Sequence, residues 1–324
     1  MICEVFLNDC IEFLQSNKYT FDLTYLDPPF NQNKDYESHD DDMNKEEYWK
    51  WMEEVCALTF RYTSEGGAIY FMQREKNTKE VIDILEKTGW SFQNLIIWKK
   101  KSSAVPSNSR FGKHYQIIVF ATKGIKPRVF NKLRIDPPLL VTEKLKRPSG
   151  MYVTDVWDDI RELTSGYFAG DEPLRKTDGV RAHNQQSPLQ LLIRIILSST
   201  KTGDLVFDPF AGTGTTNIVA KQLNRNSLSV EKDKNNYDLI LKRLNEIRKV
   251  DNIDKFHKEY LYTDNLKEIW QNSDIEYTHY TQPSFFQEKK SVIKIREYKY
   301  LNSDNSVKKV GEQLDGGKKT KKNI

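Results

Sequence analysis

The feature that most constrains this sequence is a glycine-rich turn between an apolar strand and a helix. Residues 204–207 (DLVF) predict a buried strand, and residues 208–216 (DPFAGTGTT) follow it directly. Gly212 and Gly214 have no Cβ, so the turn can fold tightly and a ligand can approach its backbone. A strand, a glycine turn and a helix in this order predict a ligand site at the carboxyl edge of a parallel sheet.

The next strand, residues 227–230, ends at an acidic residue, Glu231. An acid about 20 residues beyond such glycines can accept hydrogen bonds from ribose hydroxyls. The glycine pattern is GxG, since Asn217 occupies the place of a third glycine, and no P-loop lysine follows. These features favour a nucleoside ligand over a pyrophosphate. Taken alone, the segment is also compatible with a plain strand-to-helix turn.

A second motif, Asp27-Pro28-Pro29-Phe30, ends the apolar strand predicted at residues 21–26. The exocyclic amine of a base is a poor nucleophile, so a catalyst must orient it by accepting hydrogen bonds from its N–H groups. Asp27 and the Pro28 carbonyl can accept them, and the two prolines bring no competing N–H donor. Phe30 offers a flat face for an unstacked base. Such a tetrapeptide is also compatible with an ordinary turn.

Strands and helices alternate along the first part of the chain. Helical spacing over residues 45–62 and 76–87 alternates with strand patterns at residues 68–72, 92–98 and 116–121. This alternation predicts a wound α/β sheet. Residues 124–181 contain five prolines and no sustained period, which indicates an inserted subdomain or long loops. Beyond Arg248 the chain is polar, with weak strand patterns near residues 291–295.

Composition narrows the class of protein. Fifty basic and 46 acidic side chains give a net charge of +4, with basic runs at residues 99–101, 123–134 and 144–147 that permit contact with a polyanion. The three cysteines, Cys3, Cys10 and Cys56, have neither disulfide nor zinc spacing, so we expect no metal. No apolar run reaches the length of a membrane span. We therefore expect a reduced, cytoplasmic protein without a membrane role.

Together these residues resemble the amino-methyltransferases of bacterial restriction-modification systems, in the permuted β arrangement. In that family the DPP(Y/F) motif precedes the target-recognition region and the cofactor motif FxGxG comes last, as residues 27–30 and 210–214 do here. Lesser matches are found at residues 8–10 (NDC), 155–157 (DVW) and 183–188 (HNQQSP). The sequence departs from the family at Ser187, where a lysine is usual, at Asn184, which replaces a proline, and at Asn8, which replaces a glycine.

The resemblance implies a Rossmann-like, S-adenosylmethionine-dependent methyltransferase sheet, doubly wound and mostly parallel with an antiparallel edge strand, and an inserted target-recognition region. It implies methyl transfer to adenine N6 in double-stranded DNA by base flipping, with cytosine N4 as the alternative. The implied catalytic residues are Asp27, Pro28, Pro29 and Phe30. The implied cofactor-binding residues are Asp9, Cys10, Asp27, His183, Asn184, Asp208, Phe210, Ala211, Gly212, Thr213, Gly214, Thr215, Glu231 and Lys232.

Four regions are expected: a catalytic half at residues 1–124, a target-recognition region at 125–181, a cofactor-binding half at 182–248 and a C-terminal extension at 249–324. A homodimer and a separate cognate endonuclease are both compatible with the sequence. Methylation of RNA or protein glutamine is opposed by the order of the motifs. Intact Asp27, Phe30 and Glu231 oppose a silent DNA-binding module, and the polar region beyond Arg248 opposes a fused nuclease.

Overall fold

The structure is a computed structural model of the 324-residue chain. It describes residues 1–31, 35–36, 39–40, 43–101, 106, 108–136, 149–163, 170–175, 186–271, 294–301 and 307–315. The chain forms two compact units, residues 1–280 and 281–324. In the second unit, β13 (Lys294–Leu301) and β14 (Val307–Asp315) pair as an antiparallel hairpin.

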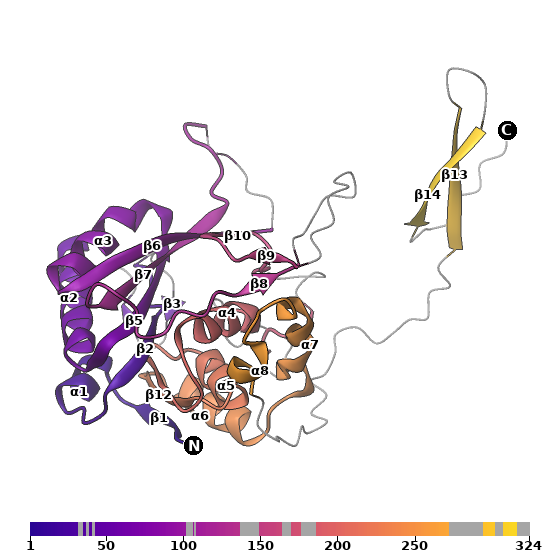
Figure 1. Ribbon diagram of the computed structural model, residues 1–324. Helices are drawn as coiled ribbons and strands as arrows, with labels where there is room; N and C mark the ends of the chain where they lie inside the picture. The colour runs from indigo at the N-terminus through magenta and orange to yellow at the C-terminus, as the bar shows by residue number, and fades with distance from the viewer. Residues whose placement is uncertain are drawn as a thin grey trace. The chain divides into compact units, whose positions relative to one another are not determined.

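Within the described residues, eight strands form the main sheet (Figure 1). In spatial order they are β1 (Cys3–Leu7), β12 (Asn226–Glu231), β11 (Leu205–Asp208), β2 (Phe21–Leu26), β5 (Thr63–Arg74), β7 (Tyr115–Lys123), β6 (Trp90–Lys99) and β10 (Val156–Trp157). The first five are parallel, β7 is antiparallel to both of its neighbours, and β10 is parallel to β6. The predicted fold class, a mostly parallel methyltransferase α/β sheet, is confirmed. Its antiparallel strand lies near one edge of the sheet.

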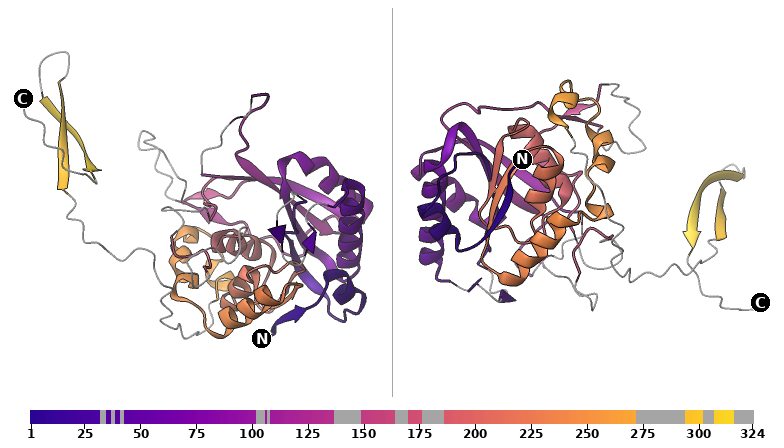
Figure 2. Two further views of the ribbon diagram at one scale, coloured as in Figure 1. Left: turned by 180° about the vertical axis from the view of Figure 1, so that it is seen from behind. Right: turned by 90° about the horizontal axis from the view of Figure 1, so that it is seen from below.

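Helices cover both faces of this sheet, and the two groups lie apart in Figures 1 and 2. One face carries α1 (Cys10–Gln15), α2 (Lys45–Arg61) and α3 (Thr78–Lys87), the last preceded by the short helix η1 (Glu75–Asn77). The other carries α4 (Leu189–Ser199), α5 (Thr215–Gln222) and α6 (Lys234–Asn245). Alternation along β5 fits this layering, because Ile69 and Phe71 pack with α2 and α3, whereas Tyr70 and Met72 pack in the core cluster of α4.

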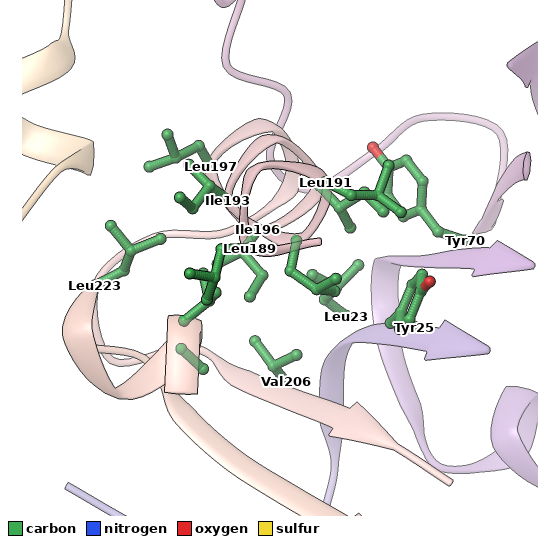
Figure 3. Close-up of a cluster of buried hydrophobic side chains, with 14 of the residues drawn as sticks. Leu23, Tyr25, Tyr70, Leu189, Leu191, Ile193, Ile196, Leu197, Val206 and Leu223 are labelled. Carbon is green, nitrogen blue, oxygen red and sulfur yellow. The ribbon is translucent and has the colours of Figure 1, made fainter. Parts of the chain in front are cut away.

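Helix α4 is mostly apolar and buried over most of its length, and its one charged side chain, Arg194, is buried and pairs with Asp159. Figure 3 shows its apolar side chains above Leu23 of β2 and Val206 of β11. Its outer side is covered by short helices of residues 249–271, which bury Ile253, Tyr260 and Trp270 in the same core. These are η3 (Lys249–Asp251), α7 (Asp254–His257), η4 (Lys258–Tyr260) and α8 (Leu266–Ile269). The start of the polar C-terminal region is therefore part of the main core.

The described residues of the predicted insertion include three short strands. Strand β8 (Arg134–Ile135) pairs with β9 (Met151–Tyr152), and β10 extends the main sheet through Trp157. A further short pair, β3 (Asp35–Tyr36) and β4 (His39–Asp40), lies between β2 and α2 in the sequence. Val156 and Trp157 of the DVW segment thus form a strand of the main sheet, which is too short for a periodicity search to detect.

The position of the site follows from the topology. Strands β2 and β11 are neighbours, with Leu23 opposite Val206 and Thr24 opposite Phe207. From β11 the chain crosses through α5 to β12 on one side, whereas from β2 it crosses through α2 to β5 on the other. Ligands of wound α/β sheets bind where the strand order reverses in this way, beyond the carboxyl ends of the strands. The loops after Leu26 and Asp208 emerge at that point.

Candidate active site

A cavity opens at this edge of the sheet. Both sequence motifs contribute to its wall, so the two loops lie side by side although they are far apart in the sequence. The predicted site residues that line it are Asp9, Cys10, Asp27, Pro28, Pro29, Asp208, Phe210, Ala211, Gly212, Thr213, Thr215, Glu231 and Lys232. Phe30 and Gly214 are not among its lining residues. His183 and Asn184 lie outside the described residues.

The glycine turn is fixed at its start by Asp208. One carboxylate oxygen accepts from the Phe210 amide at 3.0 Å, and the other accepts from the Thr216 hydroxyl at 2.6 Å. The carboxylate therefore joins the end of β11 to the first turn of α5. Burial raises the pKa of Asp208 to about 6. Gly214 precedes α5 with a φ of 72°, and a Cβ there would come within 2.6 Å of Ile240 on α6. We conclude that Gly214 allows α5 and α6 to pack closely.

A buried ion cluster holds the same turn from behind. Arg243 donates to the Thr213 carbonyl at 2.8 Å and pairs with Asp251 at 2.8 Å. Asp251 also pairs with Arg248, at 2.7 Å, and the two arginines hold its pKa well below its usual range although burial opposes this. Arg248 reaches the Glu172 carbonyl at 2.9 Å. The cluster thus ties the turn to helix η3 and to residues 170–175.

Glu231 ends β12 with both carboxylate oxygens engaged by backbone amides. Oε2 accepts from Gly212 at 2.8 Å, and Oε1 accepts from Asp233 at 2.9 Å. The residue is 9% exposed, and burial raises its pKa to about 7. A carboxylate has roughly four acceptor positions, and the Asn236 side chain is a third partner of this one. Glu231 can therefore still receive a hydroxyl group from a ligand in the cavity.

Asp9 begins helix α1 and lines the cavity beside Cys10. Its carboxylate accepts from the Ile11 amide at 2.9 Å and lies 3.4 Å from the Lys232 ammonium. An ion pair this exposed contributes little to stability, so the pair serves mainly to place charge at the rim. Burial, followed by the charge of Asp9, raises the pKa of the Cys10 thiol.

Asp27 follows β2, and two hydroxyl groups lie close to the same oxygen of its carboxylate. Ser187 Oγ donates to Oδ2 at 3.0 Å, and the Tyr25 hydroxyl lies 3.3 Å from the same atom. Burial raises the pKa of Asp27 to about 7; the Asp208 charge also raises it, while the Ser187 hydrogen bond opposes both. Sequence reasoning missed Tyr25 as a partner. Its position two residues before Asp27, on the same side of an extended chain, is the one feature that could have indicated it.

The remainder of the DPPF loop is held from helix α2 and the core. The Tyr48 hydroxyl donates to the Pro29 carbonyl at 2.8 Å and accepts from the side-chain amide of Gln73 at 2.8 Å. Phe30 is 3% exposed and belongs to the hydrophobic core. Asn31 has a φ of 51°, and its amide group pairs with the backbone of Met43 at 2.7 and 2.8 Å. The loop is therefore anchored at Pro29, Phe30 and Asn31.

Trp51 of α2 also lines the cavity, with its ring edge-on to Phe210 at 5.4 Å. No feature of the sequence indicated this contact. The described residues that line the cavity include four carboxyl groups and one ammonium group. The carboxyl groups belong to Asp9, Asp27, Asp208 and Glu231, and the ammonium group belongs to Lys232. The acidic wall favours a ligand with hydroxyl donors and a positive charge, and it disfavours a phosphate.

In the part of the chain that the structure describes, no group of three or more His, Cys, Asp or Glu side chains is arranged to hold a metal ion. The described helices also include none with the length and apolarity that crossing a membrane requires.

The profile of a protein family described as DNA methylase matches residues 21–242, a range that includes both motifs of the cavity. The chain belongs to this family. The sequence-based assignment to the DNA amino-methyltransferases is thereby confirmed.

Named relatives agree with this assignment. The type II methyltransferase M.HpaI of Haemophilus parainfluenzae is 30% identical to this DNA methylase over 238 residues, which cover 73% of the chain and 72% of the relative. The DNA adenine methyltransferase YhdJ of Escherichia coli K12 is 28% identical over 236 residues, covering 69% and 76%. The crystal structure of the M1.HpyAVI–SAM complex, 25% identical, matches with a TM-score of 0.53 over 76% of the chain and 100% of its own.

Proposed function

We propose that this DNA methylase transfers a methyl group from S-adenosylmethionine to N6 of adenine in double-stranded DNA, within a restriction-modification system. The observation that carries the proposal is the shared cavity, because the Asp27 loop and the Gly212 turn both line it. A relative named as a DNA adenine methyltransferase supports adenine as the target. Cytosine N4 is the alternative that the experiment below distinguishes.

The cavity wall fits S-adenosylmethionine, which supplies an electrophilic methyl group attached to a positively charged sulfur. Glu231 has acceptor capacity for a ribose hydroxyl, and the carboxyl groups of Asp208 and Asp27 provide a negative environment for the sulfonium. Gly212 and its neighbours expose backbone at the turn. The residues proposed to hold the cofactor are Asp9, Cys10, Asp27, Asp208, Phe210, Ala211, Gly212, Thr213, Thr215, Glu231 and Lys232, with His183, Asn184 and Gly214 retained from the sequence-based prediction.

Asp27 and the Pro28 carbonyl are proposed to orient the target amine by accepting its N–H groups. Two acceptors on one side of the nitrogen direct its lone pair toward the methyl donor. The anchoring of Pro29 by Tyr48 supports this role, because the loop must keep its shape while the base enters. In the same scheme Asp27 is ionised and acts as an acceptor.

A target amine can reach this cavity only if its base leaves the helix stack, so base flipping is part of the proposal. Phe30 remains the predicted stacking partner of the flipped base. Its ring is packed in the core, so stacking would require the ring to turn out toward the base. Pro29, which lines the cavity, lies next to it in the same loop.

The regional division is proposed as predicted, with a Rossmann-like catalytic half at 1–124, target recognition at 125–181, a cofactor half at 182–248 and an extension from 249. Basic side chains of the recognition region would contact phosphates and base edges. A homodimer and a separate cognate endonuclease complete the proposal for a restriction-modification system.

The test is to incubate the purified chain with unmethylated duplex DNA and S-adenosylmethionine and to analyse the digested nucleosides by mass spectrometry. We expect N6-methyldeoxyadenosine. If N4-methyldeoxycytidine is found instead, the target is cytosine N4 and not adenine N6. Methylation of RNA or protein without methylation of DNA would overturn the proposal. Sequencing that detects methylated bases then gives the recognition sequence.

A further inference from the structure

The carboxylate of Asp27 is asymmetric in its hydrogen bonding. Ser187 and Tyr25 both contact Oδ2, at 3.0 and 3.3 Å. Within the described part of the chain, no hydrogen bond is made to Oδ1. Because Asp27 lines the cavity, the arrangement leaves one oxygen for a ligand and fixes the other to the protein.

The two hydroxyl groups form a chain rather than two independent donors. The Tyr25 hydroxyl lies 2.9 Å from Ser187 Oγ, which is shorter than its 3.3 Å distance to Asp27. Each hydroxyl has one proton to donate. The short contacts are satisfied when Tyr25 donates to Ser187 and Ser187 donates to Asp27. Hydrogen bonds in such a chain polarise and strengthen one another.

The two hydroxyl groups carry no charge, so they affect the protonation of Asp27 only through hydrogen bonds. Asp208 on β11 faces the carboxylate with a like charge, and Lys100, after β6, has a weaker opposing effect. Strand β5 contributes one hydrogen-bonding contact to the two hydroxyl groups, between the Tyr25 hydroxyl and the Met72 sulfur at 3.7 Å. Burial raises the pKa of Asp27 to about 7, and the two hydroxyl groups lower it. Hydrogen bonds to the ionised form thus limit the rise of this pKa, so that a substantial fraction of Asp27 is ionised at neutral pH.

Protonation of Asp27 would also block the oxygen that is needed to accept the target amine. Oδ2 already accepts hydrogen bonds, so an added proton would reside on Oδ1. Oδ1 would then be a donor, and it could not accept an N–H of the target amine. The reaction therefore needs the ionised carboxylate with Oδ2 occupied by the protein.

We propose that Ser187 and Tyr25 are positioning residues for methyl transfer, and that their hydroxyl chain holds Oδ2 of Asp27 so that Oδ1 receives the amine of the target base. The inference rests on the proposed function, since it assigns a task within the same site. It also gives a role to Ser187, at which this sequence departs from the family pattern.

The molecule contains a matched control. Ser199, on α4, lies 2.8 Å from the hydroxyl of Tyr70 in a second serine–tyrosine pair, which is buried. Tyr70 and Tyr25 lie on the neighbouring strands β5 and β2, and both are labelled in Figure 3. Neither Ser199 nor Tyr70 lines the cavity. Removing this hydroxyl pair tests the general cost of such a bond without touching Asp27.

The experiment measures kcat and KM between about pH 5 and pH 9 for the Ser187→Ala, Ser187→Thr and Tyr25→Phe variants beside Ser199→Ala and Tyr70→Phe. Ser187→Ala should lower kcat about 10-fold, leave KM for the cofactor unchanged and move the acid limb up by about 0.5 to 1 pH unit. Ser187→Thr should restore the acid limb of the pH profile to its wild-type position. Tyr25→Phe should shift the acid limb less than Ser187→Ala does. The two controls should match the wild-type profile.

An unshifted acid limb in Ser187→Ala would overturn the inference, as would an equal shift in Ser199→Ala. Should the alanine variant be poorly folded by circular dichroism, Ser187→Cys gives a second reading, because a thiol keeps the volume but donates weakly. It should shift the limb in the same direction by a smaller amount. A wild-type chain that methylates no DNA would instead refute the proposed function and this inference with it.

Discussion

The amide of Gly212 donates to Oε2 of Glu231 across a distance of 2.8 Å. This bond joins the glycine turn after β11 to the end of β12, and the other carboxylate oxygen holds the Asp233 amide at the start of α6. One side chain therefore fixes two loops at the rim of the cavity and presents its remaining acceptor capacity to it. Its loss should affect ligand binding more than folding.

Replacing Glu231 with glutamine should weaken the binding of S-adenosylmethionine. The amide nitrogen of glutamine cannot accept a hydrogen bond, so a backbone amide or a ligand hydroxyl loses its acceptor. A cost of about 1–3 kcal/mol corresponds to roughly 5- to 150-fold in the dissociation constant. Isothermal titration calorimetry measures it, with Glu12→Gln on the exposed side of α1 as control. Equal affinities of the two variants would contradict the assigned role.

Cofactor binding should release protons in mildly acidic solution. Burial raises the pKa of Glu231 to about 7 and that of Asp208 to about 6, so both are partly protonated near pH 6.5. A positively charged ligand favours their ionised forms and lowers these pKa values, so affinity should rise with pH up to about 7 and then level. Calorimetry in two buffers of different protonation enthalpy measures the release. Proton uptake, or affinity independent of pH, would count against the acidic cavity.

Replacing Asp251 with asparagine should destabilise the protein strongly. Two buried arginines, Arg243 and Arg248, would lose their partner, at a cost of roughly 3–5 kcal/mol. Because the pKa of Asp251 is lowered by folding, its contribution is present above its unfolded pKa, about 4, and is lost as the pH falls through its folded value. Urea unfolding measures the free energy. The matched control is Asp83→Asn, whose partner Lys79 is exposed, and which should unfold like the wild type.

Replacing Gly214 with alanine should cost more than the same change at Gly203. Both residues have positive φ, 72° and 83°, so both variants bear backbone strain of about 1–2 kcal/mol. Only at Gly214 does the new Cβ meet another residue, Ile240, at 2.6 Å, whereas nothing lies within 4 Å of the Cβ at Gly203. Overpacking adds roughly 1–3 kcal/mol. Equal unfolding free energies for the two variants would show that α5 and α6 tolerate the extra carbon.

The strands that precede the two motifs, β2 and β11, were predictable because each is a short apolar run in the sequence. Strand β2 has the predicted bounds, and β11 is displaced by one residue, since each apolar run ends at a polar loop. The pairing of β10 was not predictable, because two residues give no period. Residues 249–271 were interpreted as polar, yet Ile253, Tyr260 and Trp270 are buried. Their apolar side chains are scattered over single-turn helices, and only tertiary packing brings them together.

The residues of the site were predictable where they belong to a motif, and their partners were not. Asp27, Gly212 and Glu231 each follow a strand, and the parallel sheet brings the strand ends together. Ser187 lies 160 positions from Asp27, and nothing in its own segment indicates the contact. Phe30 was predicted to stack on a base, yet its ring is packed in the core. Side-chain direction after a double proline depends on packing that the sequence does not display.

In the proposed mechanism one cavity binds both the cofactor and the target amine, and Asp27 acts on the amine. The most direct measurement compares wild type and Asp27→Ala in transfer of tritiated methyl to DNA and in binding of S-adenosylmethionine. We expect Asp27→Ala to reduce methyl transfer by at least about 100-fold and to change the affinity for the cofactor by only a few-fold. Asp27→Ala with full transfer activity would contradict this mechanism.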